Sequence, residues 1–69
     1  MADPKLGNGL KVARTALGLT QADLAERVGV SRKTINTVEN GVFVPSTVLA
    51  LRLAKALGVA VEVLFWIEE

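Results

Sequence analysis

The sequence predicts an all-α fold, and three observations support this prediction. Hydroxyl side chains suited to capping helices precede three apolar segments, at Thr20, Ser31 and Ser46. Glycines, which adopt the positive φ of a helix C-terminus without strain, follow four segments, at Gly18, Gly29, Gly41 and Gly58. Between these signals, apolar residues recur at the spacing of one helix face.

The composition limits what the chain can do. Its 69 residues correspond to one small domain, able to bury roughly 60% of the surface exposed in its unfolded state. It contains no cysteine, so that neither disulfides nor thiolate metal sites are expected. It also contains no histidine, the commonest metal ligand and general base. We therefore expect neither an enzyme nor a metal or cofactor site.

Charge and hydropathy indicate the compartment and the partner. Residues 1–9 contain no apolar core like that of a signal peptide, and no apolar run approaches the ~20 residues of a membrane span, so we expect a cytoplasmic protein. The net charge of +1 is unevenly distributed: residues 1–36 carry six basic and three acidic side chains, and residues 37–69 carry two and four. The positive N-terminal half favours a nucleic-acid partner.

The N-terminal segment lacks helical periodicity. Residues 1–7 contain Pro4 and Gly7, and we expect them to form a mobile arm. A first helix is expected over residues 8–17, with Leu10, Ala13 and Leu17 on one face.

Two short helices joined by a tight turn are predicted next. Thr20 caps the first of them, and Asp23 completes an imperfect capping box. This helix ends at Gly29, and the signals restart two residues later with Ser31 as the second cap. Gly41 follows the second helix as its stop signal. Two capped helices around a glycine turn are typical of a helix-turn-helix.

The second of these helices has a polar face without an acid. At about 100° per residue, an arc of roughly 140° carries Arg32, Lys33, Asn36, Thr37 and Asn40. Arg and Lys donate to guanine, Asn pairs with adenine, and the Thr methyl contacts the thymine methyl. The arc predicts base contacts in a major groove from Arg32, Lys33, Asn36 and Thr37. The alternative is an ordinary amphipathic helix with a solvated polar face.

These segments resemble the lambda-repressor-like helix-turn-helix family, the Cro-type (XRE) group of small regulators. The similarity covers residues 10–65 and rests on these motifs: Leu19-Thr20-Gln21, Leu24-Ala25, Val28-Gly29-Val30-Ser31, Ile35, Glu39-Asn40-Gly41, Pro45-Ser46, Leu53-Ala54, Leu57-Gly58-Val59 and Leu64-Phe65. The resemblance implies a compact five-helix domain that binds double-stranded DNA and usually acts as a dimer.

The resemblance also implies roles for single residues. Gln21, Ser31 and Asn40 are expected to contact the DNA backbone. Arg14 is expected to form a largely buried ion pair with Glu39, which would tie the first helix to the recognition helix. The alternative for Arg14 is a surface side chain whose aliphatic stem covers apolar neighbours.

The loop Val42–Val44 departs from the family pattern. Relatives often carry Lys or Arg here and use it to hold the DNA backbone, whereas this chain has three apolar residues. Three interpretations remain open: the backbone N–H groups contact phosphates, Phe43 folds over the core as a lid, or the loop contacts a second protein.

The C-terminal third combines a central helix with an ambiguous tail. Ser46 caps a fourth helix that is apolar on more than one face and ends at Gly58. The alternating apolar residues of the tail favour a strand, whereas the resemblance implies a short fifth helix. We expect a helix through Phe65 and an extended C-terminal tail over residues 66–69, which places the DNA-binding domain at residues 8–65.

An apolar surplus in the tail predicts a homodimer interface. Hydrophobic residues make up 51% of the chain, more than a small monomer readily buries. The surplus far from the recognition helix consists of Val61, Val63, Phe65, Trp66 and Ile67.

The sequence therefore predicts a homodimeric, sequence-specific double-stranded DNA-binding protein that represses transcription by occupying a two-fold operator. One alternative is an antitoxin or other protein-interaction module that uses the loop Val42–Val44 and the tail, with DNA binding secondary. Another is a fragment of a larger regulator whose ligand domain follows Glu69.

Overall fold

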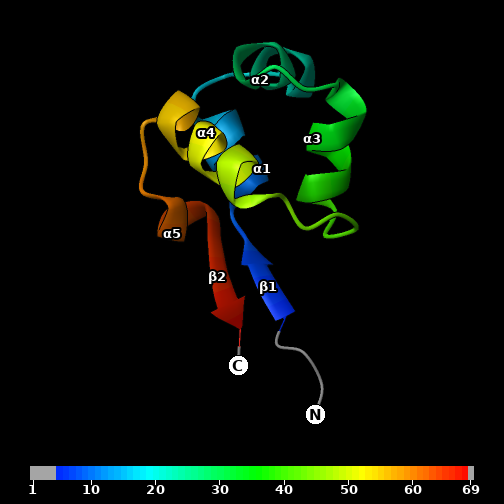
Figure 1. Cartoon of the computed structure of the whole chain (residues 1–69). Coiled ribbons are helices and arrows are strands. Elements are labelled where there is room, and N and C mark those ends of the chain that lie inside the picture. Colours follow the sequence, from blue (N-terminus) through cyan, green and yellow to red (C-terminus); the bar gives the residue numbers. More distant parts are fainter. Residues whose placement is uncertain (1–4, 69) are drawn as a thin grey trace.

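A computed structural model describes residues 5–68. Within this part of the chain it contains five helices and a two-stranded sheet (Figure 1). In chain order the elements are β1 Lys5–Asn8, α1 Leu10–Ala16, α2 Gln21–Val28, α3 Arg32–Glu39, α4 Thr47–Leu57, α5 Val61–Leu64 and β2 Phe65–Glu68. The predicted five-helix domain with a central helix-turn-helix is confirmed, and the sheet is an addition to it.

Side-chain caps set the boundaries of α2 and α3. The Thr20 hydroxyl accepts from the Asp23 N–H at 3.0 Å, and the Asp23 carboxylate accepts from the Thr20 N–H at 3.0 Å, which completes the capping box. Gly29 ends α2 with a φ of 75°, a value that suits glycine. The Ser31 hydroxyl then caps α3 by accepting from the Thr34 N–H at 3.2 Å.

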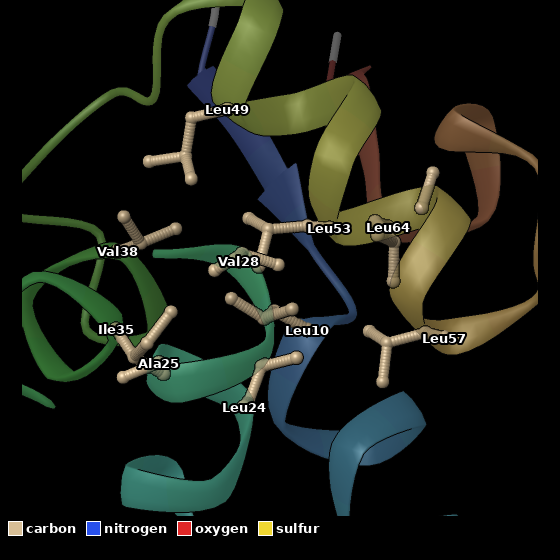
Figure 2. Close-up of a cluster of buried hydrophobic side chains, with 11 residues drawn as sticks. Leu10, Leu24, Ala25, Val28, Ile35, Val38, Leu49, Leu53, Leu57 and Leu64 are labelled. Atoms are coloured by element: carbon tan, nitrogen blue, oxygen red, sulfur yellow. The ribbon is translucent and has the colours of Figure 1, made fainter. Parts of the chain in front are cut away.

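Helices of seven or eight residues, such as α1, α2 and α3, are marginal in isolation. They are stabilised by packing around one hydrophobic core. Each helix contributes at least one side chain that is shielded from solvent. The largest fully buried ones are Leu10, Leu24, Ile35, Val38, Leu53 and Leu64. They converge between the helices, with Leu10 near the middle of the cluster (Figure 2).

The two strands form an antiparallel ribbon that projects from the helical body (Figure 1). Leu6 pairs with Ile67, and Gly7 pairs with Trp66. A Cβ atom on Gly7 would lie 2.0 Å from Trp66 Nε1, so the indole lies directly against the glycine backbone. The ribbon therefore depends on glycine at this position.

The ribbon corrects the expectation for the N-terminal segment. Residues 5–7 were expected to belong to a mobile arm, but they lie in β1, and α1 begins at Leu10 rather than at Asn8. A strand of four residues has little periodicity of its own, and its hydrogen-bond partner lies at the other end of the chain. The expectation for residues 1–4 lies outside the described residues.

The tail has the predicted order of a short helix followed by an extended end. The α5 helix ends at Leu64, one residue earlier than expected, and Phe65 begins β2. Ala60 provides no side-chain cap for α5, in keeping with its short length. Across residues 5–68, no helix is long and apolar enough to cross a membrane.

Candidate nucleic-acid interface

The polar arc of α3 lies on the outside of the molecule. Arg32, Lys33, Asn36 and Asn40 are exposed, and Thr37 is half-buried. On the opposite side of the helix, Ile35 and Val38 are fully buried in the core. The buried pair fixes the rotation of α3 about its axis, so the side chains predicted to contact bases share one accessible face.

The α2 helix supports α3 from behind. Ala25 is only 3% exposed and belongs to the same buried cluster as Ile35 (Figure 2). The turn between the two helices closes with a hydrogen bond from the Val30 N–H to the Ala25 carbonyl at 3.0 Å. A larger side chain at position 25 would push the helices apart, so the small residue sets the geometry of the motif.

A buried ion pair joins α1 to the last residue of α3. Arg14 Nε donates to Glu39 Oε2 at 2.6 Å, and Arg14 Nη2 donates to Glu39 Oε1 at 3.1 Å, in a two-pronged arrangement. The two side chains are 10% and 3% exposed. Arg14 Nη1 also donates to the Leu19 carbonyl at 2.7 Å. The hydrogen bond to Glu39 raises the pKa of Arg14 above its ordinary value, against the effect of burial.

Glu39 also begins a line of hydrogen-bonded amides that reaches the exposed arc. Gln21 Nε2 donates to Glu39 Oε1 at 3.1 Å, and Gln21 Oε1 accepts from Asn36 Nδ2 at 3.4 Å. Asn36 Oδ1 in turn accepts from Asn40 Nδ2 at 3.1 Å. Three of the residues predicted to contact DNA are therefore connected to one another and to the buried carboxylate.

Ser31, predicted to contact the DNA backbone, is exposed at the start of α3. Its hydroxyl caps the helix and lies 3.0 Å from the Thr34 hydroxyl. Arg32 and Lys33 follow it directly, so the beginning of the recognition helix carries its positive charge.

The structure bears on two of the interpretations of the loop Val42–Val44. The N–H groups of Val42 and Phe43 both donate to the Thr37 carbonyl, at 3.0 and 3.2 Å, so these two amides are already occupied. Phe43 is 46% exposed and does not close over the core. Instead, its side chain and Val42 line an open hollow of about 380 Å³ beside Lys33, Thr34 and Thr37.

The residues predicted to form the dimer interface are divided between two environments. Val61 and Phe65 are partly buried against the core of their own chain. Val63, Trp66 and Ile67 are exposed at 54%, 42% and 57%. Val61 and Phe65 also line a second open hollow of about 230 Å³, together with Leu6, Val44, Pro45, Thr47, Ala50 and Leu51.

Sequence reasoning missed two structural connections of this site. The first is the contact from Gln21 to Asn36, because these residues lie on different helices; the spacing of Asn36 and Asn40 by one helical turn was the available part of the signal. The second is Asn8, whose side chain accepts from the Leu10 N–H and donates to the Val38 carbonyl. The contact from Asn8 to Val38 has no local signal in the sequence, because Val38 lies 30 residues away, near the end of α3.

A capped helix pair with an outward face of Arg, Lys and Asn defines the class of helix-turn-helix DNA-binding domains. Comparison with known proteins supports this classification. A helix-turn-helix family model matches residues 10–64, and the chain belongs to this family. It is a Cro-type helix-turn-helix transcriptional regulator, and proteins of this class bind DNA and are not enzymes.

Two relatives in sequence are small proteins of similar length. The chain is 44% identical over 62 residues to the uncharacterized HTH-type transcriptional regulator YgzD of Bacillus subtilis, covering 90% of this chain and 94% of that protein. It is 47% identical over 62 residues to an uncharacterized HTH-type transcriptional regulator of Methanocaldococcus jannaschii, with the same coverage of both chains.

Solved structures share the fold. The restriction-modification controller protein C.AhdI from Aeromonas hydrophila superposes with a TM-score of 0.74 at 40% identity, over 77% of this chain and 80% of that one. The clp gene regulator ClgR from Corynebacterium glutamicum superposes with a TM-score of 0.75 at 31% identity, over 78% of this chain and 57% of that one.

Proposed function

We propose that this protein is a sequence-specific repressor that binds a two-fold DNA operator as a homodimer, with residues 8–65 as its DNA-binding domain. The observation that carries the proposal is the continuous exposed face of α3, which holds two cations and two carboxamides and no acid. Arg32, Lys33, Asn36 and Thr37 contact base edges. Gln21, Ser31 and Asn40 contact the phosphate backbone beside them.

Two-fold assembly follows from the size of the site. One recognition helix spans too few base pairs for high affinity, and proteins of this class place two such helices roughly 34 Å apart on successive turns of DNA. Apolar surface away from α3 is supplied by Val63 on α5 and by Trp66 and Ile67 on the ribbon, all of them exposed. Leu6 lies opposite Ile67 and adds to this surface. Repression then results from occupancy of the operator.

Selection of bound duplexes from a random DNA pool tests the proposal. The protein should enrich a sequence made of two inverted half-sites with centres about 10 base pairs apart. Enrichment of a single half-site would argue against the dimer. Binding that depends on salt but selects no sequence would contradict base reading by α3.

A second candidate function is supported by the loop Val42–Val44. Val42 and Val44 are 79% and 69% exposed, which is a high exposure for apolar side chains of one short loop and suits a surface that binds another protein, as in an antitoxin. Val42→Lys separates the two functions. In a DNA-binding loop, the added cation should raise DNA affinity and steepen its salt dependence by about one unit. In a protein-binding loop, it should disrupt a complex with a copurifying partner and leave DNA affinity unchanged.

A further inference from the structure

We propose that Gln21 is a positioning residue for base recognition: it transmits a fixed hydrogen-bond direction from the buried Glu39 carboxylate to the amide of Asn36. The inference rests on the proposed DNA-binding function and deepens it, because it assigns Asn36 a preference for adenine and names the group that enforces it. In the expectation from family resemblance, Gln21 only contacts a phosphate.

The direction of the line begins at Glu39. A carboxylate accepts hydrogen bonds and donates none, so Gln21 must turn its NH₂ group toward Glu39 Oε1, at 3.1 Å. The Glu39 side chain is 3% exposed and both of its oxygens accept hydrogen bonds from Arg14, so it cannot turn away to meet solvent. The carbonyl Oε1 of Gln21 therefore faces outward, toward α3.

The same matching of donors to acceptors fixes the amides on the exposed face of α3. Only a donor satisfies Gln21 Oε1, so Asn36 presents Nδ2 to it, at 3.4 Å. Asn36 Oδ1 is then directed away and accepts from Asn40 Nδ2 at 3.1 Å. Every amide in the line points its donor toward the carboxylate, and reversing one of them places two donors or two acceptors face to face.

This restriction matters for base reading because a free carboxamide rotates easily. An amide NH₂ carries two hydrogens and an amide oxygen has two lone pairs, so Asn36 keeps one donor and one acceptor for a base edge. Adenine offers an acceptor at N7 and a donor at N6, which match an Asn held in one direction. Guanine offers acceptors at both corresponding positions, and thymine offers an acceptor and a methyl group. A fixed Asn36 therefore favours adenine, whereas a freely rotating one adapts to other bases.

The test uses Gln21→Met, which keeps the length of the side chain and removes both hydrogen bonds. In the free protein, the side-chain amide of Asn36 should become more mobile, as measured by ¹⁵N relaxation of its NH₂ group. On DNA, affinities are compared for the selected operator and for operators changed at the base pair whose preference is lost in Asn36→Ala. The preference at this base pair should fall at least about fivefold, the lower end expected of a bidentate amide–adenine contact.

Two comparisons keep the result specific. Preferences at the base pair that depends on Arg32 serve as the internal control and should change less than about twofold, since separate contacts are nearly independent. In the Asn36→Ala background, Gln21→Met should have no further effect on the preference at the Asn36 position. A uniform loss of affinity for all duplexes would overturn the proposal and leave Gln21 as a phosphate contact. If the Asn36 amide in free Gln21→Met is as immobile as in the wild type, the proposal is also overturned. This outcome does not depend on DNA binding. A wild-type protein that enriches no duplex would instead contradict the proposed function itself.

Discussion

Substitutions of single residues on α3 are expected to separate sequence specificity from general affinity for DNA. Arg32 begins the exposed arc directly after the Ser31 cap, and the proposed function places its guanidinium at a base edge. Arg32→Ala should weaken binding to the selected operator by ~1–3 kcal/mol and change binding to random DNA much less. Titrations against both kinds of duplex measure the difference, and Lys11→Ala on α1 is the control for loss of one positive charge. Equal losses on both duplexes would make Arg32 a phosphate contact.

The intact ion pair between Arg14 and Glu39 is expected to be required for the stability of the folded state. Its two side chains are nearly excluded from solvent, so the loss of one partner leaves the other charge buried. Glu39→Ala should cost ~3–5 kcal/mol of unfolding free energy. The double variant Arg14→Met with Glu39→Leu should recover much of this loss, because it removes both charges and keeps apolar volume. Chemical denaturation measures both, with the exposed Glu26→Ala as control. If Glu39→Ala unfolds like that control, the pair contributes little.

At the scale of an element, the α2 cap links stability to pH. The Thr20 N–H, followed by the Thr20 hydroxyl, holds the pKa of Asp23 below its ordinary value. The folded state therefore binds this proton less readily than the unfolded state. The resulting stabilisation is present above the unfolded pKa, about 4, and disappears as the pH falls through the lower folded pKa.

The corresponding variant is Asp23→Asn, which keeps the shape of the side chain. It should be less stable than the wild type near about pH 6, and the difference should disappear in acid. Melting curves across this range provide the measurement. Glu26→Gln on the same helix is the control and should leave the profile unchanged. A constant difference at every pH would show that the charge of Asp23 has no part in the cap.

The ribbon formed by β1 and β2 requires a residue without a side chain at position 7. Gly7→Ala would place a methyl group 2.0 Å from Trp66 Nε1, so the indole must move away. The fluorescence of Trp66, the one tryptophan in the chain, should shift to longer wavelength as the ring enters solvent. Lys5→Ala, on the same face of β1, is the matched control and should leave the spectrum unchanged. An unchanged spectrum in Gly7→Ala would contradict the packing of Trp66 on this strand.

At the scale of the whole molecule, the prediction concerns assembly. Ile67 is 57% exposed on the ribbon, and Val12 is 74% exposed on α1. Ile67→Asp should place a charge in the dimer interface and yield folded monomers that bind the operator weakly. Val12→Asp is the matched control and should remain dimeric. Sedimentation velocity with circular dichroism distinguishes the two. A dimeric, fully active Ile67→Asp protein would move the proposed interface elsewhere, with the loop Val42–Val44 as the next candidate.

The sequence by itself determined the helices and the class of the protein. Caps and glycine stops act within a few residues, so Thr20, Ser31 and Gly29 marked their helix boundaries correctly. Helical spacing likewise separated the buried side of α3, with Ile35 and Val38, from its exposed polar arc. These features depend on neighbours in the chain, and the sequence displays such neighbours directly.

Only the tertiary structure decided which segments far apart in the sequence contact one another. The strand Lys5–Asn8 exists because β2 pairs with it and because Gly7 leaves room for Trp66. The amide line from Glu39 to Asn36 requires the close packing of α2 against α3. Each of these contacts joins residues whose proximity is set by the common core and not by local spacing, so no local pattern in the chain could reveal them.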